Sequence, residues 1–265
     1  MSKSIFDGLK FRKVYSPIHN LDPRVKFIYV IAVFVAAILF GSVIPLTVLF
    51  IMQIPIVLLA RVHRQWLRSL RGALFLASFI FLVNIATSFF TSNYTLSALQ
   101  LEGAFAMTLR FVVLVESFSV FFLTTSPDHL GLALEESHVP YEFSFAFTTA
   151  VRFVPVLAEE AQTIMDAQKA RGLELEKGNF MKRIRNYVPV LIPLIVSAIR
   201  RSLELAEAME SRAWGAAKKR TNLYALKLHR GDAALLVITG LILAVTIYVF
   251  FYVPIPTVSH LLGFV

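Results

Sequence analysis

The chain has 265 residues, of which 57% are hydrophobic and only 16% are charged. This many apolar side chains cannot be buried in one soluble core, so the composition predicts an all-α polytopic membrane protein. The formal charge of +9 does not indicate nucleic-acid binding, because the basic residues lie between apolar runs and are not interleaved with aromatic residues. The chain has no cysteine, which excludes disulfides and thiolate metal sites, and its six His show no metal-ligand spacing.

The first predicted element is a tight helical hairpin. Asp22 followed by Pro23 is typical of a capped helix start. The run from Phe27 to Ala60 carries no charge and is too long for one span but sufficient for two short ones, with a turn at Gly41 to Pro45. Basic residues flank the run on both sides, as in cytoplasmic loops, so we expect an even number of crossings.

Three further spans are predicted. Gly72 to Thr91 is the third, and the loop Ser92 to Glu102 faces outward because it has no Lys or Arg. Gly103 to Thr125 returns the chain to the cytoplasm, and Ala233 to Tyr252 is the fifth span. The tail after Tyr252 lacks Lys and Arg, so we expect a cytoplasmic N-terminus and an outside C-terminus in the cell membrane.

Arg110 and Glu116 lie within the predicted fourth span. Charged side chains are costly in lipid, so both should face the bundle interior or lie near the interface. Six positions apart on a helix they do not share a face, and we do not expect them to pair. They could line a transport pathway, but we favour structural charges that bond to neighbouring helices.

The part from Ser126 to Asp232 differs in texture and is predicted to be a cytoplasmic coupling domain of long amphipathic helices. Its apolar runs, Phe143 to Val151 and Val188 to Ile199, are too short to span. Were the first to cross the membrane, the basic residues from Lys169 to Arg185 would lie outside, against the positive-inside rule. The predicted organisation is therefore residues 1–125, with four spans, then 126–232, and then 233–265, with the last span.

Three helices are expected in this coupling domain. A short one runs from Pro127 to about Ser137, and a long one ends at Arg171-Gly172. A second long helix, bent at its prolines, runs from about Phe180 to Trp214.

Catalytic patterns are missing from the chain. There is no Walker A, Gly-x-Ser-x-Gly or His-Glu-x-x-His motif, so we expect a non-enzymatic chain that does not hydrolyse ATP itself. The adjacent carboxylates Glu135-Glu136 and Glu159-Glu160 point to different helix faces. They indicate solvated helix surface rather than an acid/base site.

Two tripeptides, Ala170-Arg171-Gly172 and Ser211-Arg212-Ala213, end the two long helices. Small neighbours let each Arg approach another surface closely, and Gly172 and Gly215 are placed to stop the helices. Gly172 is expected to adopt a positive φ, whereas Ala213 is expected to be free of that constraint. Cations are favoured near helix C-termini in general, but two such motifs in equivalent positions favour a docking role.

This layout resembles the transmembrane T component of energy-coupling factor transporters, which import vitamins and metal ions. The most specific parts are the two tripeptides, the second within Ala208 to Gly215, together with Arg152-Phe153-Val154-Pro155 and Leu21-Asp22-Pro23-Arg24. The second tripeptide has Ala where some relatives have Gly, and both residues are small.

The resemblance implies that Ala170, Arg171 and Gly172, and likewise Ser211, Arg212 and Ala213, dock on two cytoplasmic ATPase subunits. These subunits bind the ATP, so no cofactor is implied in this chain. A membrane-embedded S component would bind the substrate and pack on the apolar helix faces. Two other classes stay open: a conventional ABC importer permease, and a membrane scaffold without a transport role.

Overall fold

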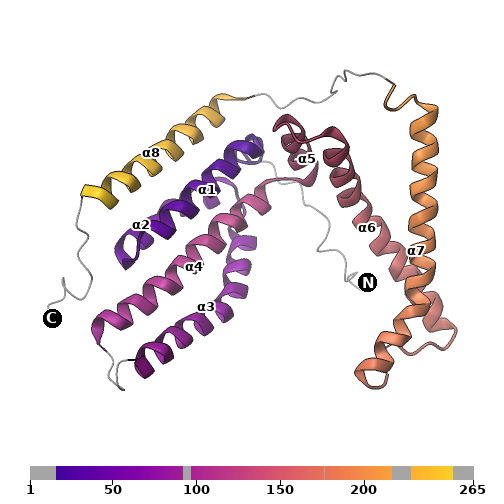
Figure 1. Ribbon diagram of the computed structural model, residues 1–265, viewed down its shortest axis with the longest axis horizontal. Helices are drawn as coiled ribbons and strands as arrows, with labels where there is room; N and C mark the ends of the chain where they lie inside the picture. The colour runs from indigo at the N-terminus through magenta and orange to yellow at the C-terminus, as the bar shows by residue number, and fades with distance from the viewer. Residues whose placement is uncertain (1–15, 92–96, 176, 217–227, 253–265) are drawn as a thin grey trace. The chain divides into compact units, whose positions relative to one another are not determined.

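The computed structural model describes residues 16–91, 97–175, 177–216 and 228–252, and the regular structure within these ranges is entirely α-helical. Its helices in chain order are α1 (Pro23–Leu39), α2 (Val43–Leu59), α3 (His63–Thr91), α4 (Ala98–Thr124), α5 (Pro127–Glu136), α6 (Tyr141–Ala170), α7 (Phe180–Ser211) and α8 (Arg230–Tyr252) (Figure 1). The described residues form two compact units, one from 16–133 with 228–252 and the other from 134–216. The predicted all-α class is confirmed.

The first unit contains the apolar helices. Among the described residues, α3, α4 and α8 are each long and apolar enough to cross a membrane, and α2 is apolar but shorter. Two helices, α1 and α2, stand where the hairpin is predicted, each of 17 residues, which is at the lower limit of about 17–25 residues for a span. The break between them is shorter than the predicted turn from Gly41 to Pro45, because α2 begins at Val43. The chain is therefore a multi-pass membrane protein, and the total of five crossings stays a prediction.

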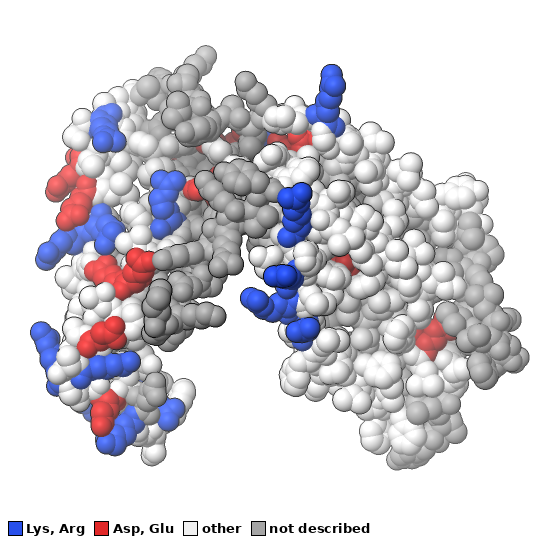
Figure 2. All heavy atoms as spheres, turned by 180° about the vertical axis from the view of Figure 1, so that it is seen from behind, with Lys and Arg blue, Asp and Glu red and all other residues white. Residues whose placement is uncertain are grey.

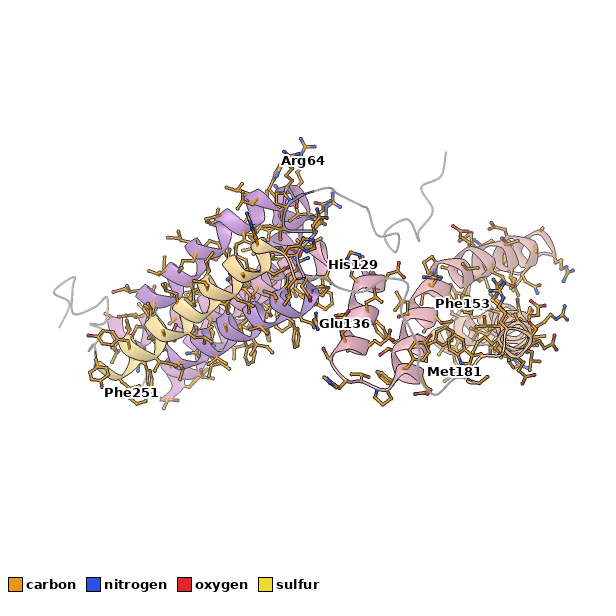
Figure 3. All side chains as sticks on the ribbon, turned by 90° about the horizontal axis from the view of Figure 1, so that it is seen from above. Arg64, His129, Glu136, Phe153, Met181 and Phe251 are labelled. Atoms are coloured by element: carbon orange, nitrogen blue, oxygen red, sulfur yellow. The ribbon has the colours of Figure 1, made fainter. Side chains whose placement is uncertain are left out.

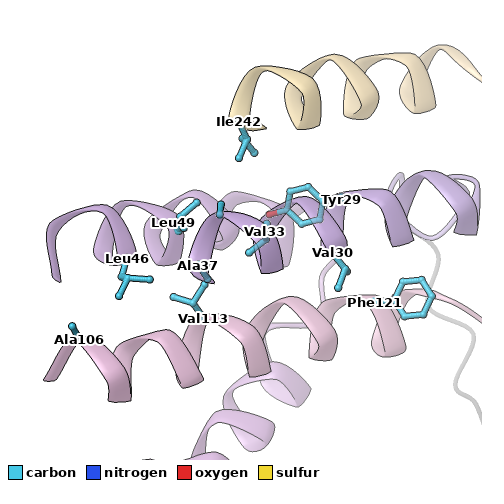
Figure 4. Close-up of a cluster of buried hydrophobic side chains, with 11 residues drawn as sticks. Tyr29, Val30, Val33, Ala37, Leu46, Leu49, Ala106, Val113, Phe121 and Ile242 are labelled. Atoms are coloured by element: carbon cyan, nitrogen blue, oxygen red, sulfur yellow. The ribbon is translucent and has the colours of Figure 1, made fainter. Parts of the chain in front are cut away.

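Helix α4 lies at the centre of this unit and contacts α1, α2 and α3, while α1 also packs against α8. Figure 4 shows the buried cluster to which α1, α2, α4 and α8 contribute. Its members are Tyr29, Val30, Val33, Ala36, Ala37, Leu46, Leu49, Ala106, Val113, Phe121 and Ile242. Three alanines in the cluster let the helix backbones approach closely, which is how membrane helices associate without a hydrophobic driving force between them.

The starts of α1 and α8 share one buried junction. As predicted, Asp22 caps α1 and accepts the N–H of Arg24 at 2.9 Å, with Pro23 in the first turn. Burial alone would raise the pKa of Asp22, but hydrogen bonds from the Arg24 side chain and backbone lower that pKa below its ordinary value. Lys26 donates to the Thr124 carbonyl at 2.9 Å, which binds the end of α4 to the same place.

The two charges within α4 have different surroundings. Arg110 donates a 2.7 Å hydrogen bond to the carbonyl of Phe40 at the end of α1, as expected for a structural charge. Glu116 is fully buried, which confirms its predicted interior position. The expectation that Glu116 bonds to neighbouring helices is wrong, because neither carboxylate oxygen has a hydrogen-bond partner among the described residues.

The outer surface of this unit is largely apolar. Large side chains such as Phe75, at 81% exposure, Phe90 and Phe251 project from α3 and α8 without covering neighbours. Figure 2 shows few charged side chains over these helices and many more over α6 and α7. A surface of this kind is suited to contact with lipid, whereas the charged side chains of α6 and α7 are suited to exposure to water.

Candidate functional site

The two arginine motifs belong to the second compact unit, in which α6 and α7 run in opposite directions and pack on each other. The predicted run Phe143 to Val151 is not a separate segment, because it continues without a break into the rest of α6. Prolines at 155, 189 and 193 lie inside the two helices without ending them.

A polar contact between the helices centres on Glu160. Its carboxylate accepts from the Ser197 hydroxyl and lies 3.2 Å from the Arg201 guanidinium. That guanidinium also lies 5.9 Å from the ring centre of Phe153, which Figure 3 labels on α6. The prediction that Glu160 is solvated helix surface is wrong. Its partners lie about forty residues away in sequence, where helical periodicity carries no information.

Helix α6 ends in a Schellman motif around Arg171. Arg171 is the C-cap, and Gly172 follows with φ of +89°. The N–H of Gly172 donates to the Lys169 carbonyl at 2.9 Å, and the N–H of Leu173 donates to the Gln168 carbonyl at 3.0 Å. These two bonds satisfy helix-end carbonyls and define the motif. The predicted helix stop at Gly172, with its positive φ, is confirmed.

Helix α7 ends in the same motif around Arg212, with the corresponding hydrogen bonds. The N–H of Ala213 donates to the Glu210 backbone carbonyl at 2.9 Å, and the N–H of Trp214 donates to the Met209 carbonyl at 3.0 Å. Ala213 has φ of +55°, so the expectation that Ala213 is free of this constraint is wrong. The helix ends at Ser211 rather than near Trp214, and both Ala213 and Gly215 follow it with positive φ, at +55° and +86°.

Both arginines are exposed, as are the four small residues beside them. Neither guanidinium has a hydrogen-bond or ion-pair partner within the described part of the chain. The Gln168 side chain donates to the Pro189 carbonyl at 3.2 Å, so the Arg171 end of α6 lies beside the early part of α7. From Pro189 to Arg212 the helix rises about 35 Å at 1.5 Å per residue. The two arginines thus stand at opposite ends of the helix pair.

An aromatic cluster fixes the Arg212 end. The ring centre of Trp214 lies 4.5 Å from that of Phe145 and 5.4 Å from that of Tyr141, both near the start of α6. Sequence reasoning quoted Trp214 within the motif but gave it no role, since an aromatic residue after a helix end does not reveal its distant partner. The contact accounts for the strained Ala213, because ring packing offsets the roughly 1 kcal/mol cost of positive φ.

A long apolar stripe on α7 has no cover within the described residues. Its side chains recur at helical spacing and are each at least 41% exposed: Phe180, Ile184, Val188, Leu191, Ile195, Ile199 and Leu203. An exposed apolar surface of this length marks a contact site for a partner or a membrane.

Comparisons with known proteins agree with this arrangement. The cobalt transport protein family CbiQ matches residues 15–223. The energy-coupling factor transporter transmembrane protein EcfT of Thermosediminibacter oceani is 33% identical over 86% of this chain and 91% of its own length. The proteins of that name from Thermanaerovibrio acidaminovorans and Lactococcus lactis are 36% and 32% identical, over 80% and 84% of this chain and 84% and 89% of their own lengths. The chain therefore belongs to the family of transmembrane T components of energy-coupling factor transporters.

Proposed function

We propose that this chain transmits ATP-driven motion of two cytoplasmic ATPase subunits to a membrane-embedded S component, for uptake of a vitamin or a metal ion. The observation that carries the proposal is the repeated helix end, in which one type of cap presents Arg171 and Arg212 at opposite ends of α6 and α7, both exposed and without a partner among the described residues. In this proposal residues 126–232 are cytoplasmic, the N-terminus is cytoplasmic and the C-terminus is outside.

An arginine at a capped helix end suits directional docking. The guanidinium is always charged and grips a carboxylate through paired hydrogen bonds, so each arginine would anchor in an acidic groove of one ATPase. The cap keeps the helix end compact, and small neighbours allow close approach. ATP would be bound by the ATPase subunits, and this chain would carry no cofactor and perform no catalysis.

The S component would pack on apolar helix faces that are exposed within the described residues. The α7 stripe from Val188 to Leu203 and the start of α6 around Phe143, which is 62% exposed, offer such surfaces. Substrate choice would then rest with the S component.

Charge reversal tests the docking. Arg171→Glu and Arg212→Glu should each weaken recovery of the ATPase subunits and nearly abolish uptake, because breaking a buried charge pair costs about 3 to 5 kcal/mol. Arg200→Glu, an equal change at an exposed position within α7, is the matched control and should leave recovery unchanged. Unchanged ATPase recovery for both end variants would show that the arginines are not docking residues.

Reconstitution separates the proposal from the two other classes. The chain with ATPases and a candidate S component should take up substrate, and omission of the S component should abolish uptake. A conventional permease predicts uptake without any S component, and a scaffold predicts none in either case.

A further inference from the structure

A pocket of about 600 Å³ lies where the start of α7 meets the loop that follows α6. Leu173, Met181 and Pro189 form apolar walls, and Lys182, Arg185 and Asn186 supply polar groups. Asn186 donates to the Glu174 carbonyl at 2.8 Å, which holds the loop against the helix. The pocket therefore combines two cations with apolar walls.

The side chains next to the pocket are unusually exposed for apolar residues. Phe180 is 78% exposed, Met181 is 74% exposed and Ile184 is 50% exposed. Figure 3 labels Met181 at the start of α7. We refer to Phe180, Met181, Lys182, Ile184 and Arg185 together as the Phe180 patch. It lies at the opposite end of α7 from Arg212.

The charge around the Phe180 patch is positive. From Arg171 to Pro189, with Arg171 included, the sequence has five basic and two acidic residues. Glu174 already pairs with Lys177 at 2.8 Å. Lys182 and Arg185 make no hydrogen bond or ion pair within the described ranges, so both cations are available for an anion.

We propose that the Phe180 patch binds the anionic phospholipid surface of the membrane, with a lipid phosphate between Lys182 and Arg185. Phe180, Met181 and Ile184 would enter the boundary between headgroups and acyl chains. Aromatic and aliphatic residues beside Lys and Arg are the composition of helices that lie in the membrane interface. The cytoplasmic leaflet carries the complementary negative charge.

A lipid surface fits this patch better than a protein partner. The cores of protein interfaces are depleted in Lys, whereas here Lys182 follows directly after Phe180 and Met181, two apolar residues that are each more than 70% exposed. The chain is itself embedded in a bilayer, so a lipid surface is always close to it. This inference is independent of whether Arg171 and Arg212 bind ATPases.

A single fluorescent label can test the contact, because the chain has no cysteine. The full chain carrying Met181→Cys is labelled with an environment-sensitive dye and reconstituted in bilayers that contain lipids with a quencher on the acyl chain. Quenching should be stronger with phosphatidylglycerol present than in pure phosphatidylcholine. Lys182→Gln with Arg185→Gln should lower the equilibrium constant for contact of the patch with the bilayer, read from the quenched fraction at a fixed phosphatidylglycerol content, by roughly 25-fold, since each of the two basic residues contributes about fivefold.

Two controls test whether the quenching is specific to the Phe180 patch and to its two cations. A label at Glu207, which is exposed on α7, should remain unquenched. Lys169→Gln with Arg200→Gln removes the same charge elsewhere and should leave Met181 quenching unchanged. The proposal is overturned if Met181 quenching does not depend on phosphatidylglycerol, or if the two charge pairs have equal effects. It is also overturned if the label is shielded only after ATPase or S component is added, which would make the patch a protein interface.

Discussion

The backbone N–H of Asp22 donates a 2.7 Å hydrogen bond to the carboxylate of Asp232, 210 residues further along the chain. The second oxygen of Asp232 accepts the N–H of His229, also at 2.7 Å, and the side chain is fully buried. One carboxylate therefore caps α8 and joins it to the start of α1.

The two fully buried carboxylates of the bundle should respond oppositely to conversion into amides. Asp232→Asn replaces one acceptor oxygen by a donor and should lower the free energy of unfolding by about 1.5 to 3 kcal/mol. Glu116→Gln removes a charge whose oxygens have no partner among the described residues and should raise or preserve stability. Thermal unfolding in detergent, followed by size-exclusion chromatography, compares the variants. A less stable Glu116→Gln would show that its carboxylate is bonded.

The Asp22 junction should also weaken in acid. Because its folded-state pKa is lowered, Asp22 stabilises the fold above its unfolded pKa of about 3.9, and this contribution is lost as the pH falls through the folded value. Wild type should therefore exceed Asp22→Asn in thermal stability at pH 7, and the difference should shrink below about pH 4. A constant difference down to pH 3 would contradict the assigned bonds to Arg24.

The two helix caps should respond in opposite directions to exchange of Gly and Ala. No heavy atom lies within 4 Å of the Cβ that Gly172→Ala would add, so only its positive φ opposes the substitution. Gly172→Ala should destabilise its cap by about 1 kcal/mol, and Ala213→Gly should stabilise the other by a similar amount. Hydrogen exchange at the Leu173 and Trp214 amides should change by about fivefold in opposite directions. Slower exchange at Leu173 in Gly172→Ala would show that the positive φ at residue 172 does not strain an alanine there.

Bulk at the second cap should affect coupling more than assembly. Ala213→Leu adds volume beside Arg212 and leaves its charge in place, so long-range attraction persists while short paired hydrogen bonds lose their geometry. Uptake per assembled complex at saturating ATP should fall more than complex recovery does. Ala216→Leu, at another exposed position, is the control. Equal uptake per complex for Ala213→Leu and wild type would show that close approach of this helix end to the ATPase is not needed for coupling.

The predicted sidedness can be read from single cysteines in a chain that has none of its own. Lys177→Cys should be protected from an impermeant reagent added to intact cells, because its segment is predicted to be cytoplasmic. Val258→Cys, in a tail outside the described residues, should react. Labelling of Lys177→Cys from outside would reverse this topology.

The features that were predicted correctly depend on residues that are neighbours in the sequence. The cap at Asp22, the stop at Gly172 and the break between α1 and α2 each depend on neighbouring residues, so their patterns are visible in the chain itself. The left-handed Ala213 was missed because alanine carries no sign of positive φ, and its conformation depends on the packing of Trp214. The partners of Glu160 were missed for the same reason, since they come from another helix.

The packing of Trp214 on the start of α6 connects both arginines to the same helix. Arg171 is part of the far end of α6, while Arg212 is two residues from the ring that packs on Tyr141 and Phe145. If both arginines dock as proposed, a pull at either of them reaches an end of the same helix. With 30 residues, α6 is about 45 Å long. Docking of both arginines would therefore apply force to the two ends of one long helix.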